Sequence, residues 1–226
     1  MEKIKDYICN HKHILFILYA PFYCIWFMAL ERWTDRDFTI LHCGLDDLIP
    51  FVPAFIIPYY LWFAFVAFFC IYFYLKMPQS DAIKLYANLE ISMTLTLVIY
   101  TIWPNAVNLR ITDLQVDGIF TKLVSGLWSF DTDTNVCPSL HVLNTLIIVV
   151  AYFNSGKFRG KHLQNTLLVI LALAICASTV FLKQHSILDV FAAFVFCAVI
   201  ATIIYLPDWS KVFSSNKAGT NTELQP

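Results

Sequence analysis

The sequence predicts an all-α fold, a polytopic bundle of six transmembrane helices. Of its 226 residues, 59% are hydrophobic and 14% are charged, which is more apolar than an ordinary soluble domain. Apolar runs of about 20 residues, the length that crosses a bilayer, recur along the chain. These runs are apolar on every side, as in FIIPYYLWFAFVAFFCIYFYL, whereas barrel strands would alternate polar and apolar residues. Helices therefore fit the pattern, and a barrel does not.

Six runs meet this description: Ile14 to Leu30, Val52 to Leu75, Leu85 to Trp103, Leu140 to Phe153, Leu163 to Leu182, and Ile187 to Leu206. The first has no small-residue cleavage site, so we expect a retained helix. The fourth is short for a span, so we expect it to begin in the preceding loop or to continue beyond Phe153. We expect one six-helix membrane domain over residues 1–210 and a disordered cytoplasmic tail over 211–226.

Basic residues predict the orientation, because cytoplasmic loops are enriched in Lys and Arg. With six helices, both termini lie on one side, and that side collects ten basic residues: Lys3, Lys5, Lys12, Lys76, Lys84, Lys157, Arg159, Lys161, Lys211 and Lys217. The opposite side has five: Arg32, Arg36, Arg110, Lys122 and Lys183. We therefore expect a multi-pass protein, of the cell membrane, with cytoplasmic termini. Residues 31–51, residues 104–139 and the turn KQHSILD would share the outer face.

The stretch KQHSILDV contains a candidate catalytic pair. His185 and Asp189 are four residues apart, so on a helix they would share one face, about 5 to 6 Å apart at Cβ. The carboxylate could then bind one ring nitrogen, fix the tautomer and leave the other nitrogen for a substrate. The alternative is an interfacial histidine next to a helix-capping aspartate.

A second polar stretch, NVCPSLHVLNT, opens the fourth apolar run. Ser139 suits a helix cap and Pro138 a helix start, and the free N–H groups of a helix N-terminus favour phosphate. His141 lies in that first turn. A third stretch, YTIWPNAVNLRI, carries Arg110, whose planar guanidinium suits bidentate phosphate binding, although a loop arginine beside lipid headgroups is commonly just solvated.

These motifs resemble a known family. PSLH, followed about forty residues later by KQHSILD, is similar to the second and third signatures of the type-2 phosphatidate phosphatase superfamily, usually P-S-G-H and S-R-x5-H-x3-D. Ser178 stands seven residues before His185, as the third signature requires. The resemblance covers the chain from about Tyr100 to the last helix.

Some positions depart from the signatures. Leu140 replaces the glycine, as in the branch that resembles inositol-phosphorylceramide and sphingomyelin synthases. Thr179 stands at the arginine position, which makes Lys183 the candidate replacement. The first signature, K-x6-R-P, survives only as Arg110, with Trp103 at the lysine position.

The resemblance implies a metal-independent enzyme without a cofactor. It implies that His185 attacks phosphorus, Asp189 orients His185, and His141 protonates the leaving alkoxide and then activates the acceptor. The phosphate oxygens would be held by a set of five residues: Ser139, Leu140 through its amides, Arg110, Lys183 and Ser178.

The expected function is hydrolysis of a lipid phosphomonoester or pyrophosphate through a phosphohistidine. The substrate partner would be a phospholipid or an isoprenoid phosphate in the membrane, and no basic arm indicates a nucleic-acid partner. Three alternatives stay open. A lipid phosphotransferase would pass the phospho-headgroup to a lipid alcohol, a non-catalytic scaffold would keep only the fold, and a zinc site would use the same histidines and aspartate.

Overall fold

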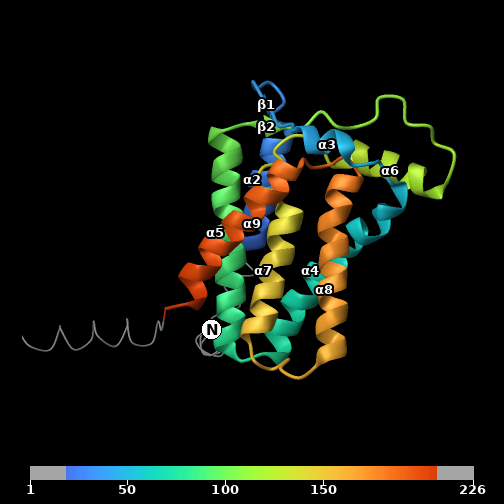
Figure 1. Cartoon of the computed structure of the whole chain (residues 1–226). Helices are drawn as coiled ribbons and strands as arrows, with labels where there is room; N and C mark the ends of the chain where they lie inside the picture. The colour runs from blue at the N-terminus through green and yellow to red at the C-terminus, as the bar shows by residue number, and fades with distance from the viewer. Residues whose placement is uncertain (1–18, 208–226) are drawn as a thin grey trace, which may run out of the picture.

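The computed structural model describes residues 19–207, which form a helical bundle with a two-stranded sheet at one end (Figure 1). Its elements are, in chain order, α2 (Tyr19–Arg32), β1 (Thr39–Ile40), α3 (Gly44–Leu48), η2 (Pro53–Phe55), α4 (Ile56–Lys76), α5 (Gln79–Ile102), β2 (Asn105–Ala106), α6 (Ile119–Phe130), α7 (Leu140–Asn154), α8 (His162–Phe181) and α9 (Ile187–Tyr205).

Each predicted run corresponds to a helix, and the predominantly helical fold is confirmed. Within residues 19–207, four helices are long and apolar enough to span a bilayer, over Pro53–Lys76, Gln79–Ile102, His162–Phe181 and Ile187–Tyr205. The described part of α2 has 14 residues and α7 has 15, so length does not establish six spans. The start of the first run and the tail over 211–226 lie outside the described residues.

The bundle core surrounds α7, which packs against α5, α8 and α9. Val142, Leu143, Ile147 and Ile148 of α7 are fully buried, because they repeat on one face at helical spacing. The helix begins at Ser139, whose Oγ accepts a hydrogen bond from the N–H of Val142, as the sequence predicts for a cap. Because Ser139 caps the helix, His141 lies in the first turn of α7, at the polar end of the bundle.

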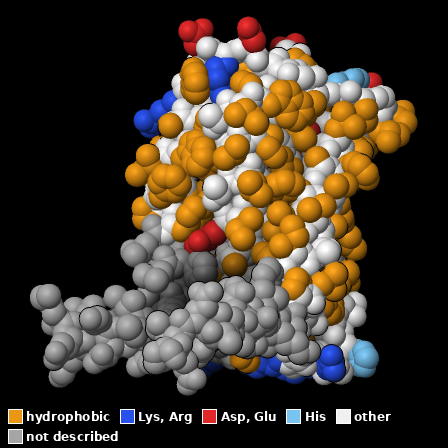
Figure 2. Space-filling model, turned by 90° about the vertical axis from the view of Figure 1, so that its left-hand side faces the viewer, with side chains coloured by type: hydrophobic (Ala, Val, Ile, Leu, Met, Phe, Trp, Pro, Cys, Tyr) orange, Lys and Arg blue, Asp and Glu red, His pale blue; other side chains and the backbone are white. Residues whose placement is uncertain are grey.

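Large apolar side chains cover the outside of the bundle. Phe68 and Leu75 on α4, Leu173 on α8, and Phe191 and Val199 on α9 are all exposed. Figure 2 shows hydrophobic side chains over the flank, with most charged side chains near the two ends. This distribution is typical of a protein whose flank faces lipid.

The polar segments gather at one end. Residues 31–51, residues 104–139 and the turn before α9 lie together there, while the α4–α5 and α7–α8 connections lie at the other end (Figure 1). β1 pairs with β2 in parallel, so the N–H of Thr39 binds the carbonyl of Pro104 and the N–H of Leu41 binds that of Ala106. The segment 104–139 also contains α6, an amphipathic helix that the sequence prediction missed.

Candidate active site

His185 and Asp189 form the predicted pair, but His185 does not lie on a helix. It occupies the turn before α9, and Ser186 is the cap of that helix. Asp189 Oδ2 accepts hydrogen bonds from the N–H of Ser186 at 2.9 Å and from His185 Nδ1 at 3.2 Å. The two geometries that the sequence left as alternatives therefore occur together: the Asp189 carboxylate caps α9 and also contacts His185.

The surroundings of this pair fix it in place. The side chain of Asp189 is fully buried and the main-chain N–H of His185 donates to the carbonyl of Thr179 at 3.1 Å. The carbonyl of Asp189 accepts from the N–H of Ser139 at 3.2 Å. This last bond ties the start of α9 to the start of α7, so the two histidine segments meet.

His141 faces His185 across a small cavity. The two ring centroids are 6.0 Å apart and the ring planes are inclined by 61°. The His141 ring packs against Tyr59 and Trp62 of α4, with centroid distances of 4.5 and 4.2 Å. Its Nε2 is buried and receives no hydrogen bond partner among residues 19–207. Aromatic contacts thus set the orientation of His141 and leave a ring nitrogen free.

The cavity between the histidines measures about 40 Å³ and has room for one or two water molecules. It is lined by Phe27, Tyr100, Asp131, Thr132, Thr134, Asn135, Val136, Leu140, His141, Gln184 and His185. In the part of the chain that the structure describes, its only acidic lining residue is Asp131, and no Lys or Arg lines it. A substrate headgroup therefore needs more space than this cavity alone provides.

An adjoining apolar cavity of about 320 Å³ supplies such space, within the size range of ligand pockets. It lies among residues of α2, α4, α6 and the start of α7. Asp131, His141, Leu140 and Phe27 line both cavities. The two spaces therefore meet at His141 and Asp131.

Arg110 does not reach the cavity, so its predicted role as a phosphate clamp is not supported by its position. Its Nη1 donates to the carbonyl of Trp128 at 3.0 Å and its Nη2 to the carbonyl of Asp131 at 2.5 Å. These bonds satisfy carbonyls at the end of α6, where the last turn of a helix leaves acceptors unpaired. Burial lowers the pKa of Arg110, although an arginine stays charged in proteins.

Lys183 also points elsewhere. Its Nζ donates to the carbonyls of Asp46 and Ile49, at 2.8 and 2.6 Å, and so joins the turn before α9 to α3 and its C-cap residue. Its backbone adopts a positive φ of 59°, which ends α8. In this position Lys183 does not replace the missing motif arginine.

The predicted serines have structural partners. Ser139 is fully buried as the α7 cap, and Ser178 is fully buried and donates from Oγ to the carbonyl of Ile175 at 2.6 Å. Neither lines the cavity. Leu140 does line it, and the N–H groups of Leu140 and His141 at the α7 N-terminus have no acceptor among the described residues. Of the five predicted phosphate contacts, Leu140 is the one placed at the site.

Asp46 is a supporting residue whose importance the sequence did not reveal. Its carboxylate accepts from Ser186 Oγ at 2.6 Å, from the N–H of Ile187 at 2.8 Å and from the N–H of Cys43 at 2.9 Å. Burial raises the pKa of Asp46, but these hydrogen bonds outweigh it and leave the pKa below its ordinary value. A carboxylate distant in sequence therefore caps α9 and holds the His185 turn.

The segment before α7 is fixed by Asn105. Its Oδ1 accepts from the N–H groups of Val136 and Cys137, and its Nδ2 donates to the carbonyls of Trp103 and Cys137. Tyr100 Oη donates to the carbonyl of Pro138 at 2.7 Å. The loop that carries Ser139 into α7 is thus held by α5 and β2.

Asp131 was also missed, although it lies ten residues before His141 in the same polar stretch. The hydroxyl of Tyr59 donates to its Oδ2, while no residue in 19–207 donates to Oδ1. Among residues 19–207, no group of three or more His, Cys, Asp and Glu side chains is arranged to hold a metal ion.

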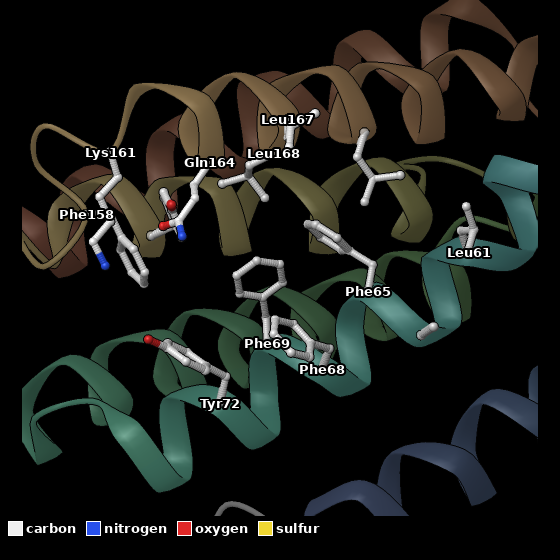
Figure 3. A pocket seen from close by; sticks show the side chains of 13 residues that line it. Leu61, Phe65, Phe68, Phe69, Tyr72, Phe158, Lys161, Gln164, Leu167 and Leu168 are labelled. Carbon is white, nitrogen blue, oxygen red and sulfur yellow. The ribbon is translucent and has the colours of Figure 1, made fainter.

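A much larger cavity lies elsewhere. A groove of about 550 Å³ lies between α4 and α8, and Figure 3 shows Phe65, Phe69 and Tyr72 facing it from α4, with Lys161 and Gln164 near one end. Its walls contain neither histidine. The polar residues of the candidate site do not line it.

The apolar helices of the bundle are compatible with a membrane protein, and the histidine pair at one end is a candidate phosphoryl-transfer site. Residues 104–212 match the model of the PAP2 superfamily, and this match supports membership of the type-2 phosphatidate phosphatase superfamily. This membership supports a phosphatase-type or phosphotransferase-type activity on phosphate esters. No curated protein and no solved structure matches the chain.

Proposed function

We propose that the protein cleaves a phosphate ester of a membrane lipid through a phosphohistidine on His185. The observation that carries this proposal is the facing pair of imidazoles, 6.0 Å apart, with Asp189 on Nδ1 of one of them. That bond leaves Nε2 of His185 as the nucleophile and stabilises the positive charge that forms on the ring.

In the first step, His185 Nε2 forms a bond to phosphorus while the bond from phosphorus to the leaving oxygen breaks. His141 donates a proton to that oxygen, and the lipid alcohol departs. In the second step, His141 takes a proton from water, which attacks phosphorus and releases the phosphate from His185. A lipid alcohol in place of water would give the transferase reaction.

The free N–H groups of Leu140 and His141 would bind the phosphate oxygens at the positive end of α7. In this proposal, two imidazoles and a helix N-terminus bind the phosphate, which is the role that the sequence predicted for Arg110 and Lys183. Because Arg110 and Lys183 lie elsewhere, neither residue supports the expected phosphomonoester or pyrophosphate substrate, which rests on the family resemblance alone.

The positive-inside distribution of Lys and Arg supports an outer-face site, with the termini in the cytoplasm. We propose the cell membrane as its location. Two variants, Asp35→Cys and Lys157→Cys, test this orientation when each is expressed in intact cells and labelled with a membrane-impermeant thiol reagent. Labelling at 157 alone would reverse it.

The test of the activity is turnover by purified protein in neutral detergent, with labelled phospholipids and isoprenoid pyrophosphates as substrates. His185→Ala should lower kcat by about 10⁴-fold or more, as expected for loss of a nucleophile. The matched control is His42→Ala, because His42 also pairs with an aspartate, Asp47, at 2.8 Å but is exposed and lines neither cavity.

Equal turnover by His185→Ala and the wild type would remove this histidine as the nucleophile. Activity lost on EDTA treatment and restored by Zn²⁺ would favour the zinc alternative. Absence of both phosphate release and new lipid with every substrate would contradict the enzyme proposal and favour a scaffold.

A further inference from the structure

Asp131 sits where the histidine cavity meets an aromatic cavity, and it has no basic partner there. The larger cavity is lined by six aromatic side chains: Tyr23, Phe27, Tyr60, Trp62, Phe63 and Phe130. Within residues 19–207, no Lys or Arg lines either cavity or forms an ion pair with Asp131. A carboxylate beside aromatic faces is the environment that binds an ammonium or quaternary ammonium group.

The orientation of the Asp131 carboxylate supports binding of a cationic group. The Tyr59 hydroxyl holds Oδ2, and Arg110 binds the main-chain carbonyl of Asp131 rather than its carboxylate. Oδ1 therefore remains available to a ligand. The guanidinium offsets part of the negative charge from behind the loop, but it does not neutralise the carboxylate by direct contact.

The charge of the site disfavours a phosphomonoester dianion. Such a group would lie near Asp131 and Asp189 with no lysine or arginine among the lining residues. Arg36 reaches the wall only to donate to the carbonyl of Tyr100 and to Oδ1 of Asn135, so the repulsion would be compensated only in part. A phosphodiester carries one negative charge, and a positive nitrogen on its headgroup would be attracted to Asp131. A zwitterionic ester therefore fits the site better than an anionic one.

We propose that the substrate is a zwitterionic phospholipid, whose phosphodiester headgroup ends in an ammonium nitrogen bound by Asp131 and the aromatic cavity. This inference rests on the proposed function and names its substrate class. His141 lines both cavities and contacts Trp62, which places the leaving oxygen, the phosphorus and the nitrogen along one continuous space.

The experiment compares kcat/KM for phosphatidylcholine and phosphatidylethanolamine with kcat/KM for phosphatidate and phosphatidylglycerol. Each lipid is present as a trace component of uncharged detergent micelles, so that surface charge stays the same. The wild type should prefer the two zwitterionic lipids. Preference for phosphatidate or phosphatidylglycerol would overturn the proposal. This comparison uses the wild type alone, so it does not depend on the folding of any variant.

Asp131→Asn should lower kcat/KM for the zwitterionic lipids by about ten- to hundredfold. It should not lower it for the anionic lipids, because asparagine keeps an acceptor for Tyr59. The matched control is Asp133→Asn, two residues away and outside both cavities. An equal loss for all four lipids would overturn the recognition role of Asp131.

The two proposals fail in different ways. If no lipid is cleaved, the proposed activity is wrong. If lipids are cleaved with an anionic preference, the activity stands and the cationic-headgroup inference falls.

Discussion

The histidine cavity and the α4–α8 groove differ in both size and chemistry. The groove is more than ten times larger, about 550 against 40 Å³, yet its walls are almost entirely aromatic and aliphatic. The small cavity collects two histidines, an aspartate, two threonines and two amides from three segments of the chain, namely residues 131–135, the start of α7 and the turn before α9. Convergent polar groups, rather than volume, therefore mark the candidate site.

The two regions also differ in how they are supported. The groove is lined mainly by apolar side chains of α4 and α8, with Tyr152 of α7 and Phe158 at one end, and its lining needs no specific hydrogen bonds. The histidine cavity depends on specific hydrogen bonds of Asp46, Asn105 and the carbonyl of Asp189, which join segments far apart in the sequence. Substitutions should therefore have large effects at one region and small effects at the other.

The largest effect is expected for His141→Asn, a substitution in the histidine cavity. We expect kcat to fall by about 10²- to 10⁴-fold, because general acid–base catalysis by one side chain contributes that much. With a labelled phosphate ester whose leaving group departs without protonation, the first step does not need His141, so alkaline quenching during turnover should trap labelled phosphate on His185 because loss of the base slows the second step. His42→Asn, at the exposed histidine, should retain turnover and should not accumulate label.

Without trapped label, His141 would have no separate role in the second step. A fall in kcat with a normal first step and no label would contradict the assignment of His141 as base.

Much of this site follows from local sequence. The spacing of His185 and Asp189 predicts their contact, and PSLH predicts a capped helix with His141 in its first turn. Both are local patterns, in which a few neighbouring residues decide the backbone. The helical bundle likewise follows from runs of apolar residues, whose composition alone selects helices in lipid.

The rest depends on contacts that no local pattern encodes. Arg110 and Lys183 have the right chemistry for phosphate, but the nearest carbonyls, those of Trp128 and Asp46 among them, bind their donors instead. Asp46 lies 140 residues before Ser186, and only the folded chain brings the two together. Charge type is visible in a sequence, whereas the direction of a long side chain is decided by its tertiary partners.

The next test addresses that support directly. Asp46→Asn should lower the stability of the fold by about 1 to 3 kcal/mol, because buried donors at Ser186 and Ile187 lose a charged acceptor. The pKa of Asp46 is below its ordinary value in the folded protein, so its stabilisation is complete above the unfolded pKa of about 3.9. It is lost as the pH falls through the lower, folded pKa.

Thermal unfolding in detergent, from pH 7 down to pH 3, measures this effect. The difference between the wild type and Asp46→Asn should be largest at neutral pH and should shrink at the acid end. Asp47→Asn is the control, because its carboxylate is exposed and pairs only with His42. A difference that grows toward low pH would contradict the sign of the pKa shift.

The smallest effect is expected in the groove. Phe68 and Phe63 are phenylalanines of α4 with similar exposure, 59% and 51%, but Phe68 lines the groove whereas Phe63 lines the aromatic cavity and lies 6.3 Å from the His141 ring. Phe68→Ala should leave kcat/KM within about twofold of the wild type, because it removes an exposed side chain far from the polar groups. Phe63→Ala should lower it by about three- to tenfold, the size of a lost aromatic contact. Since both variants remove the same atoms from the same lipid-facing helix, a general effect on packing or detergent binding would lower both values equally, and that result would erase the distinction between the two regions.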